Sequence, residues 1–310
     1  MPDSPPSSEL RWHPLLRQWV AVAAHRQGRP QLPEDWCPFC PGSGRVPDDY
    51  SVHLYPNDFP AFSPDGGARG VCDVVLYSPD HNLLPSQLTV EQWAKVIDLW
   101  TRRTVELFAN PDVQYVSIFE NTGLAIGVTM PHPHGQIYGF PFVPPLVETE
   151  VDSASDYYRE NSVCLYCHIL SGEIEDGRRL VASNESFVAF LPFFGRFPTE
   201  LQIYARRHVG SLSDLTPDER NDLASLIKLV REKYDHLYGF PMPLMMLVRQ
   251  APAKGSHPYF HFHVEFLPIQ RSPTKLKYLA AVESGNGTFL NDTRPEEQAA
   301  LMRACLTSGI

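Results

Sequence analysis

Pro131-His132-Pro133-His134-Gly135-Gln136 is the segment from which the organisation of this chain can be worked out. The two prolines fix local backbone torsions and bias the residues before them toward extended geometry. Because side chains alternate between the two faces of a strand, His132, His134 and Gln136 are expected to lie on one face. A pair of histidines in a proline-rich turn can also be an ordinary surface feature. The remainder of the chain separates these two interpretations.

The second part of the chain repeats the landmarks that surround this segment. Near-constant spacing of several landmarks indicates an internal duplication. It predicts two halves, residues 10–150 and 151–310, with a proline- and acid-rich connector over 141–156. The matched landmarks are Cys37/Cys40 with Cys164/Cys167, His81 with His208, the helix start at Thr89 with that at Thr216, each 127 residues apart, and His132 with His261, 129 residues apart.

Each half therefore carries a Cys-x-x-Cys pair followed by two histidines. Two thiolates and two imidazoles form the tetrahedral ligand set that Zn²⁺ prefers in structural sites. A Cys-x-x-Cys pair alone could also be a redox pair or two buried thiols. We predict two closed structural zinc sites, the first at Cys37, Cys40, His81 and His132, and the second at Cys164, Cys167, His208 and His261.

His134 lies outside this predicted ligand set and suggests chemistry. A neutral imidazole is a competent nucleophile toward phosphorus near pH 7. The amide of Gln136 can donate a hydrogen bond to a phosphoryl oxygen as negative charge builds there. In the second half the matching residues are His263 and Glu265, and a carboxylate repels a phosphate. We expect catalysis in the first half and a catalytically silent second half.

Composition limits the classes of partner. The chain has 310 residues and a formal net charge of −10, so a nucleic-acid backbone is not an expected partner. No apolar run approaches the length of a membrane span. Four of the six cysteines fall in the two Cys-x-x-Cys pairs. This pattern is typical of metal binding or redox chemistry in a reducing compartment, so we expect a cytoplasmic protein.

Several motifs together closely resemble the galactose-1-phosphate uridylyltransferase family, a branch of the histidine-triad superfamily, from about residue 10 to the C-terminus. The resemblance implies an α+β fold of two histidine-triad-like halves, each an antiparallel sheet with helices packed on one face. The motifs are His132-Pro-His-Gly-Gln136, Cys37-x-x-Cys40, Tyr55-Pro-Asn-Asp-Phe59, Ser78-Pro-Asp-His81 and Phe119-Glu-Asn121.

The resemblance also implies an activity. His134 would attack the α-phosphorus of UDP-glucose, release glucose-1-phosphate and hold a uridylyl group, which galactose-1-phosphate then takes to give UDP-galactose. Gln136 stands where hydrolase relatives carry a third histidine, so the covalent intermediate is expected to resist water. Relatives act as homodimers, and a homodimer is expected here.

Substrate contacts follow from the resemblance by position. They fall in four groups, which would bind the phosphates, the ribose and uracil, the diphosphate, and the hexose phosphate across a dimer interface. In that order they are Arg26 and Arg29; Asn57 and Asp58; Asn121, Gly127 and Thr129; and Lys277, Tyr278 and Glu283.

One departure from the family pattern leaves alternatives open. Some members hold iron with a Glu and three His; Glu150, His261 and His263 fit three of these places, but the fourth is Arg249, which cannot ligate a metal. Zinc on the cysteines is expected instead, a pattern that resembles plant ADP-glucose phosphorylase. An ADP-sugar phosphorylase or adenylyltransferase is therefore an alternative function, and a non-catalytic zinc nucleotide-binding protein is another.

Overall fold

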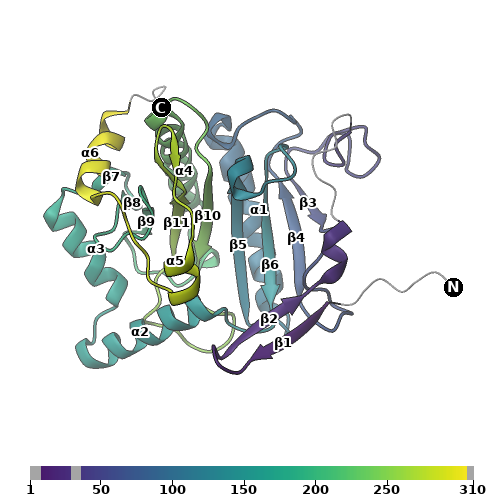
Figure 1. Cartoon of the computed structure of the whole chain (residues 1–310), viewed down its shortest axis with the longest axis horizontal. Helices are drawn as coiled ribbons and strands as arrows, with labels where there is room; N and C mark the ends of the chain where they lie inside the picture. Colours follow the sequence, from purple (N-terminus) through teal and green to yellow (C-terminus); the bar gives the residue numbers. More distant parts are fainter. Residues whose placement is uncertain (1–7, 29–35, 306–310) are drawn as a thin grey trace.

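The computed structural model describes residues 8–28 and 36–305, and within these ranges one antiparallel sheet of nine strands forms the centre of the molecule (Figure 1). The first-half order β3-β4-β6-β5 is mirrored by β10-β11-β9-β8 in the second half, and β7 adds an edge strand. The β5–β10 pair therefore joins the two halves edge to edge. The strands are β3 (His53–Pro56), β4 (Val71–Leu76), β5 (Tyr115–Thr122), β6 (His134–Phe140), β7 (Leu180–Ser183), β8 (Phe187–Phe190), β9 (Leu201–Ala205), β10 (Leu244–Arg249) and β11 (His263–Pro268).

Two long helices, α1 (Val90–Ala109) and α4 (Pro217–Tyr238), lie side by side on one face of this sheet (Figure 1). Each begins after a threonine whose hydroxyl accepts a backbone N–H from the first turn, Thr89 from Gln92 and Thr216 from Glu219. Their apolar stripes and the facing strand residues form the main core, which includes the fully buried Trp93 and Trp100. This confirms the two helices that the sequence predicted.

Most of the connector expected over residues 141–156 is helical. Helix α2 (Pro145–Asn161) begins with a proline at its first position, where no backbone N–H is needed, and has Glu148 in its first turn. Val147 and Ala154 are buried, which gives this acidic segment an apolar side to pack.

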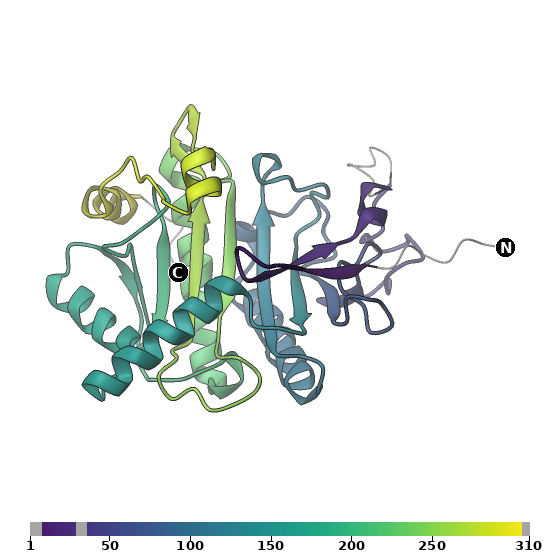
Figure 2. The ribbon, with the colours of Figure 1, turned by 60° about the horizontal axis from the view of Figure 1, so that its bottom comes forward.

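The second half carries helices on both faces of its strands. Ala154 of α2 and Tyr166 of α3 (Leu165–Asp176) pack on Phe190 and Tyr204, on the face away from α4. Figure 2 shows α2 crossing this end of the sheet. The α+β class with antiparallel strands is confirmed, and α2 and α3 are an addition to the expected single helical layer.

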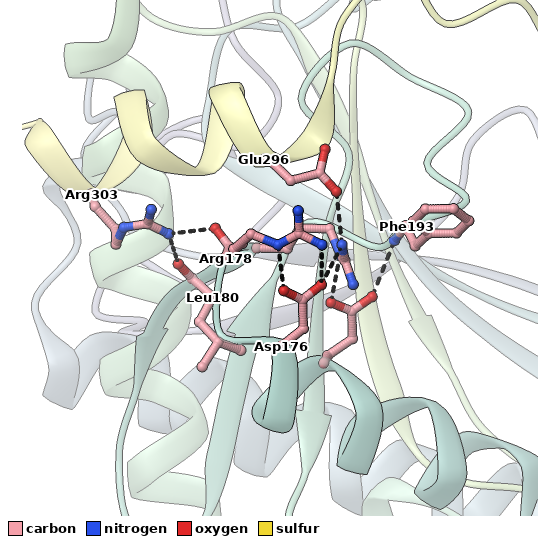
Figure 3. A network of polar contacts seen from close by, with 8 residues as sticks. Asp176, Arg178, Leu180, Phe193, Glu296 and Arg303 are labelled. Carbon is pink, nitrogen blue, oxygen red and sulfur yellow. Dashed lines mark hydrogen bonds and ion pairs between the residues drawn. The ribbon is translucent and has the colours of Figure 1, made fainter.

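The C-terminal helix α6 (Pro295–Ala304) is fixed to the second half by ion pairs (Figure 3). Arg179 lies 2.7 Å from Glu296 of α6, 2.7 Å from Glu173 and 2.8 Å from Asp176 of α3. Arg303 donates to the carbonyl oxygens of Arg178 and Leu180. Before α6 come β12 (Gln270–Ser272), β13 (Lys275–Leu276) and α5 (Ala281–Asn286).

The β1–β2 hairpin (Glu9–His13 and Gln18–Val22) lies outside the main sheet (Figure 2). Its two tryptophans, Trp12 and Trp19, pack edge to face with ring centroids 5.1 Å apart. In the part of the chain that the structure describes, none of the helices has the length and apolarity needed to cross a bilayer.

Candidate active site

His134 is the first residue of β6 and lies where two cavities meet. The smaller cavity, of about 70 Å³, is lined by a mixed polar and aromatic set, and the larger, of about 180 Å³, is mostly apolar. The smaller set includes Phe39, Tyr55, Asn57, Asp58, Thr129 and Gln136; the larger includes Leu83, Glu120, Asn121, Thr122, Val128 and Pro241. Both cavities therefore open onto the predicted nucleophile.

The backbone fixes which ring nitrogen of His134 can react. Its Nδ1 lies 2.7 Å from the carbonyl oxygen of His132, and a carbonyl can only accept, so Nδ1 carries the proton. In the neutral ring, Nε2 then holds the lone pair. The ring centroid of Phe39 lies 5.7 Å from that of His134 and 5.9 Å from that of His132, so both imidazoles contact the same aromatic ring.

Gln136 is oriented by its neighbour on the same face of β6. The hydroxyl of Tyr138 donates to Oε1 of Gln136 at 3.1 Å, which assigns the amide oxygen as the acceptor in this contact. The NH₂ group of Gln136 is thus the end that can donate to a ligand in the smaller cavity. The donation from Gln136 to a phosphoryl oxygen stays a prediction.

The residues expected at the nucleoside line the smaller cavity, but Asp58 already has a cationic partner. Its carboxylate accepts from Arg45 at 2.6 Å and from Tyr55 at 2.9 Å, while Asn57 accepts the backbone N–H of Phe59. Arg45 was not among the residues that the sequence predicted at the site; it follows the Cys37-x-x-Cys40 pair by five residues. The hydroxyl of Thr129 is buried and has no hydrogen-bond partner among the described residues.

Of the residues expected to contact the phosphates and the diphosphate, all but one lie in the part of the chain that the structure describes. Arg26 donates to the carbonyl oxygen of Phe59 at 2.9 Å, beside the nucleoside residues, and Arg29 lies outside the described residues. Asn121, near the end of β5, lines the larger cavity. Gly127 ends the turn Leu124–Ile126 with φ of 82°, a left-handed conformation that favours glycine.

The expected hexose-phosphate residues lie apart from His134 within one chain. Lys277, Tyr278 and Glu283 line a separate hollow beside β13 and α5, which has no described lining residue in common with the two cavities at His134. The ammonium of Lys277 lies 2.9 Å from the carboxylate of Glu283 and also donates to the carbonyl of Leu290. Tyr278 is 76% exposed.

The first cysteine–histidine cluster has the dimensions of a zinc site. Tetrahedral bonds to sulfur and nitrogen would place these atoms about 3.6 Å apart. The Nδ1 of His132 lies 3.8 and 3.7 Å from the sulfurs of Cys37 and Cys40, and the Nδ1 of His81 lies 3.4 Å from Cys40. The other nitrogen of His132 donates to the carbonyl of Ser78 at 2.7 Å and lies 2.9 Å from the hydroxyl of Tyr50, contacts of the kind that orient a metal ligand.

Burial also sets the protonation of this cluster. It lowers the pKa of His132 to about 4, so the imidazole is neutral, as a ligand must be. It raises the pKa of Cys37 to about 11, and a bound cation would reverse that shift by stabilising the thiolate.

The second cluster repeats this arrangement. The sulfur of Cys167 lies 3.4 Å from Nδ1 of both His208 and His261, and the other nitrogen of His261 donates to the carbonyl of Ala205 at 2.8 Å. The ligand atoms of each cluster, Cys164 included, lie within 4.8 Å of one another. Both clusters can hold a metal ion, and their donor sets fit zinc.

The second-half counterparts of His134 and Gln136 are buried among charges. Glu265 binds Arg249 at 2.7 Å, and Arg249 lies 3.9 Å from Glu150, so a guanidinium stands between two carboxylates. Burial raises the pKa of Glu150 to about 7 and lowers that of His263 to about 4. His263 and Glu265 are only 2% and 3% exposed. In the first half, the matching residues His134 and Gln136 line a cavity, whereas in the second half side chains fill the equivalent space.

Comparison with known proteins matches both halves of the chain. The model of the galactose-1-phosphate uridyl transferase N-terminal domain matches residues 61–144, and that of its C-terminal domain matches 150–304. Galactose-1-phosphate uridylyltransferase of Thermotoga maritima is 39% identical over 95% of this chain and 98% of its own length, and that of Rattus norvegicus is 32% identical over 96% and 89%.

Solved structures agree with these matches. A uridylyltransferase structure superposes with a TM-score of 0.91 at 34% identity, covering 96% of this chain and 98% of its own. An ADP-glucose phosphorylase from Arabidopsis thaliana with bound ADP-glucose superposes with a TM-score of 0.80 at 25% identity, covering 98% and 100%. Sequence and structure together place this chain in the galactose-1-phosphate uridyl transferase family.

Proposed function

We propose that this chain is a nucleotidyltransferase that exchanges a uridylyl group between UDP-glucose and galactose-1-phosphate through a covalent His134 intermediate. The observation that carries the proposal is the hydrogen bond from Nδ1 of His134, a residue that lines both cavities, to the carbonyl of His132, because it puts the lone pair of the neutral ring on Nε2. The family membership supplies the substrate class, a nucleotide sugar and a hexose-1-phosphate.

In the first step, Nε2 of His134 attacks the α-phosphorus of UDP-glucose. A nitrogen–phosphorus bond forms, and the bond from that phosphorus to the bridging oxygen breaks with its electron pair leaving on glucose-1-phosphate. The ring becomes positively charged, and the carbonyl of His132 stabilises that charge through the Nδ1 proton. The amide of Gln136 donates to an oxygen of the phosphoryl group as charge develops there.

In the second step, a phosphate oxygen of galactose-1-phosphate attacks the same phosphorus. The nitrogen–phosphorus bond breaks, its electrons return to Nε2, and UDP-galactose leaves. No third histidine stands at position 136 to help activate water, so transfer is favoured over hydrolysis. The two steps together form a ping-pong exchange, which belongs to galactose metabolism.

The individual substrate contacts remain proposals. We assign the nucleoside to the smaller cavity with Asn57, Asp58 and Thr129, and the diphosphate to Asn121, with Arg26, Arg29 and Gly127 beside it. Lys277, Tyr278 and Glu283 do not reach His134 within one chain, so their predicted role requires a partner subunit. The division of the chain at residues 150 and 151 also stays a prediction.

A homodimer would supply that partner subunit. The β1–β2 hairpin offers an apolar surface, with Leu15 and Leu16 at its turn 87% and 63% exposed and Trp12 at 48%. Exposed apolar surface of this kind marks a site of protein contact.

We propose that zinc occupies both cysteine–histidine clusters as a structural ion, with no open position for substrate. We also propose that the protein acts in the cytoplasm, where the thiols stay reduced.

The experiment is intact-mass spectrometry under non-acidic conditions after incubation with UDP-glucose and, separately, with ADP-glucose. A mass gain of one uridylyl group that is absent in His134→Ala supports the proposal. A gain only with ADP-glucose would transfer the assignment to the second candidate, an ADP-sugar phosphorylase or adenylyltransferase, which the similarity to the Arabidopsis structure favours. No adduct with either donor, in folded and zinc-loaded protein, would favour a non-catalytic nucleotide-binding protein.

A further inference from the structure

A buried cation of the second half reaches the active-site strand of the first. Arg231, on α4, lies 2.9 Å from the carboxylate of Glu120 and donates to the hydroxyl of Thr122 at 2.9 Å. That hydroxyl in turn donates to Glu120 at 2.6 Å, which closes a three-membered network. The side chains of Arg231 and Glu120 are 4% and 1% exposed. The contacts therefore form in an environment where water screens charge little.

This network holds both neighbours of Asn121. Glu120 and Thr122 flank Asn121 in β5, and all three residues line the larger cavity beside His134. With its neighbours bound to Arg231 and its backbone paired with Met245 of β10, Asn121 has little freedom to rotate with the strand. The orientation of its side chain at the cavity therefore depends on a guanidinium from the other half.

The second half lacks an equivalent network in the described structure. At the repeat distance of 127 residues before Arg231, α1 carries Thr104, whose buried hydroxyl has no hydrogen-bond partner among the described residues. The strand β10 presents Met246 and Val248 to the same core layer. A buried ion pair is a weak source of net stability, because both ions lose their hydration. Among the described residues no ion pair links α1 to β10 in this way, so the presence of the pair beneath the active strand points to a role in the site.

We propose that Arg231 is a positioning residue that directs Asn121 toward the substrate through Glu120 and Thr122. The inference rests on the proposed function, in which Asn121 contacts the diphosphate. It gives the second half an indirect part in the reaction, because α4 supplies the group that holds the ligand-binding strand of the first half in place.

The test compares Arg231→Lys with Arg179→Lys. Lysine keeps the charge but loses the planar fork that binds two partners at once. Arg179 is a matched control, since it is also buried between carboxylates, including Asp176 and Glu296 in Figure 3, but lines none of the cavities described at His134. Both variants should melt at a lower temperature. Only Arg231→Lys should lower kcat/KM for uridylyl transfer, by roughly tenfold or more.

A double-mutant cycle separates positioning from general destabilisation. If Arg231 acts through Asn121, the loss caused by Arg231→Lys should largely disappear in an Asn121→Ala background. Equal losses in both backgrounds, or a kcat/KM for Arg231→Lys that matches Arg179→Lys, would overturn the inference. Should Arg231→Lys fail to fold, Thr122→Val against Thr104→Val makes the same comparison. If wild-type protein forms no adduct with UDP-glucose, the proposed function fails, and the inference fails with it.

Discussion

Replacing Gly135 with alanine tests whether the backbone of β6 is held at the distance that the chemistry requires. A Cβ at position 135 would lie 2.1 Å from the hydroxyl oxygen of Tyr77 and 3.1 Å from the carbonyl of Phe119. To reach an ordinary van der Waals separation, the added Cβ and the hydroxyl oxygen of Tyr77 would have to move apart by roughly 1 Å. Tyr77 is fully buried, with its ring centroid 5.3 Å from that of Trp93 and 6.0 Å from that of Trp100, so its ring has no space to move aside. The strand must therefore move.

The expected cost has two parts. Overpacking of this kind lowers the free energy of unfolding by about 1–3 kcal/mol. Because His134 and Gln136 flank Gly135, a displacement of the strand misplaces both, and a misplacement on the order of 1 Å lowers the rate roughly 100-fold. The assays are thermal denaturation and the single-turnover rate of adduct formation with UDP-glucose.

The same strand offers the control. The three atoms nearest to a Cβ at Gly139 all belong to the side chains of Val113 and Val71, the closest at 3.1 Å, so Gly139→Ala should keep most of the rate. Adding Tyr77→Phe to Gly135→Ala removes the atom at 2.1 Å and should restore part of both the rate and the stability. A Gly135→Ala protein with wild-type rate and melting temperature would refute the reasoning.

Three further predictions concern the nucleophile, the zinc clusters and one surface carboxylate. His134→Gly should abolish transfer while zinc content and melting temperature stay unchanged, and added imidazole should restore some turnover; lost zinc would show that His134 is part of the metal site. Cys37→Ser should lower both zinc content and melting temperature, because metal binding contributes directly to folding; Cys72→Ser, at a buried thiol outside both clusters, should keep the zinc, and equal zinc content in both variants would contradict the ligand assignment. The hydrogen bond from Arg207 lowers the pKa of Glu219 to about 2, below its ordinary value of 4.5, so Glu219 stabilises the fold above that value and loses this effect as pH falls toward 2. The stability difference between wild type and Glu219→Gln should therefore close over that range in a pH series of denaturant melts, and a constant difference would exclude this linkage.

The sequence predicted those features whose signals lie within a short stretch or repeat at a fixed distance. Thr89 predicted the start of α1, because a capping residue is a local signal. The two cysteine–histidine clusters assembled as expected, because each ligand type recurs with the same spacing in both halves.

Features that depend on contacts between distant segments were not predictable in this way. Nothing local in Tyr115–Thr122 specifies that β5 pairs with β10, because strand pairing is decided by the fit of whole surfaces. The hydrogen bond between Arg231 and Thr122 joins residues 109 positions apart, and the charge of Arg231 is unremarkable on a helix until its burial is known. Helix α2 was missed because its prolines and acids were interpreted as a linker, although they suit a helix N-terminus.

The β5–β10 pair has a consequence for how this chain can vary in sequence. When two identical chains assemble symmetrically, every substitution occurs at both copies of a position, so a change that harms one site harms both. Here the two halves of the sheet are parts of one polypeptide, and each copy of a position can change alone. Glu265 illustrates the result. A carboxylate at position 136 would repel phosphate, but at position 265 it forms an ion pair with Arg249 in the interior instead.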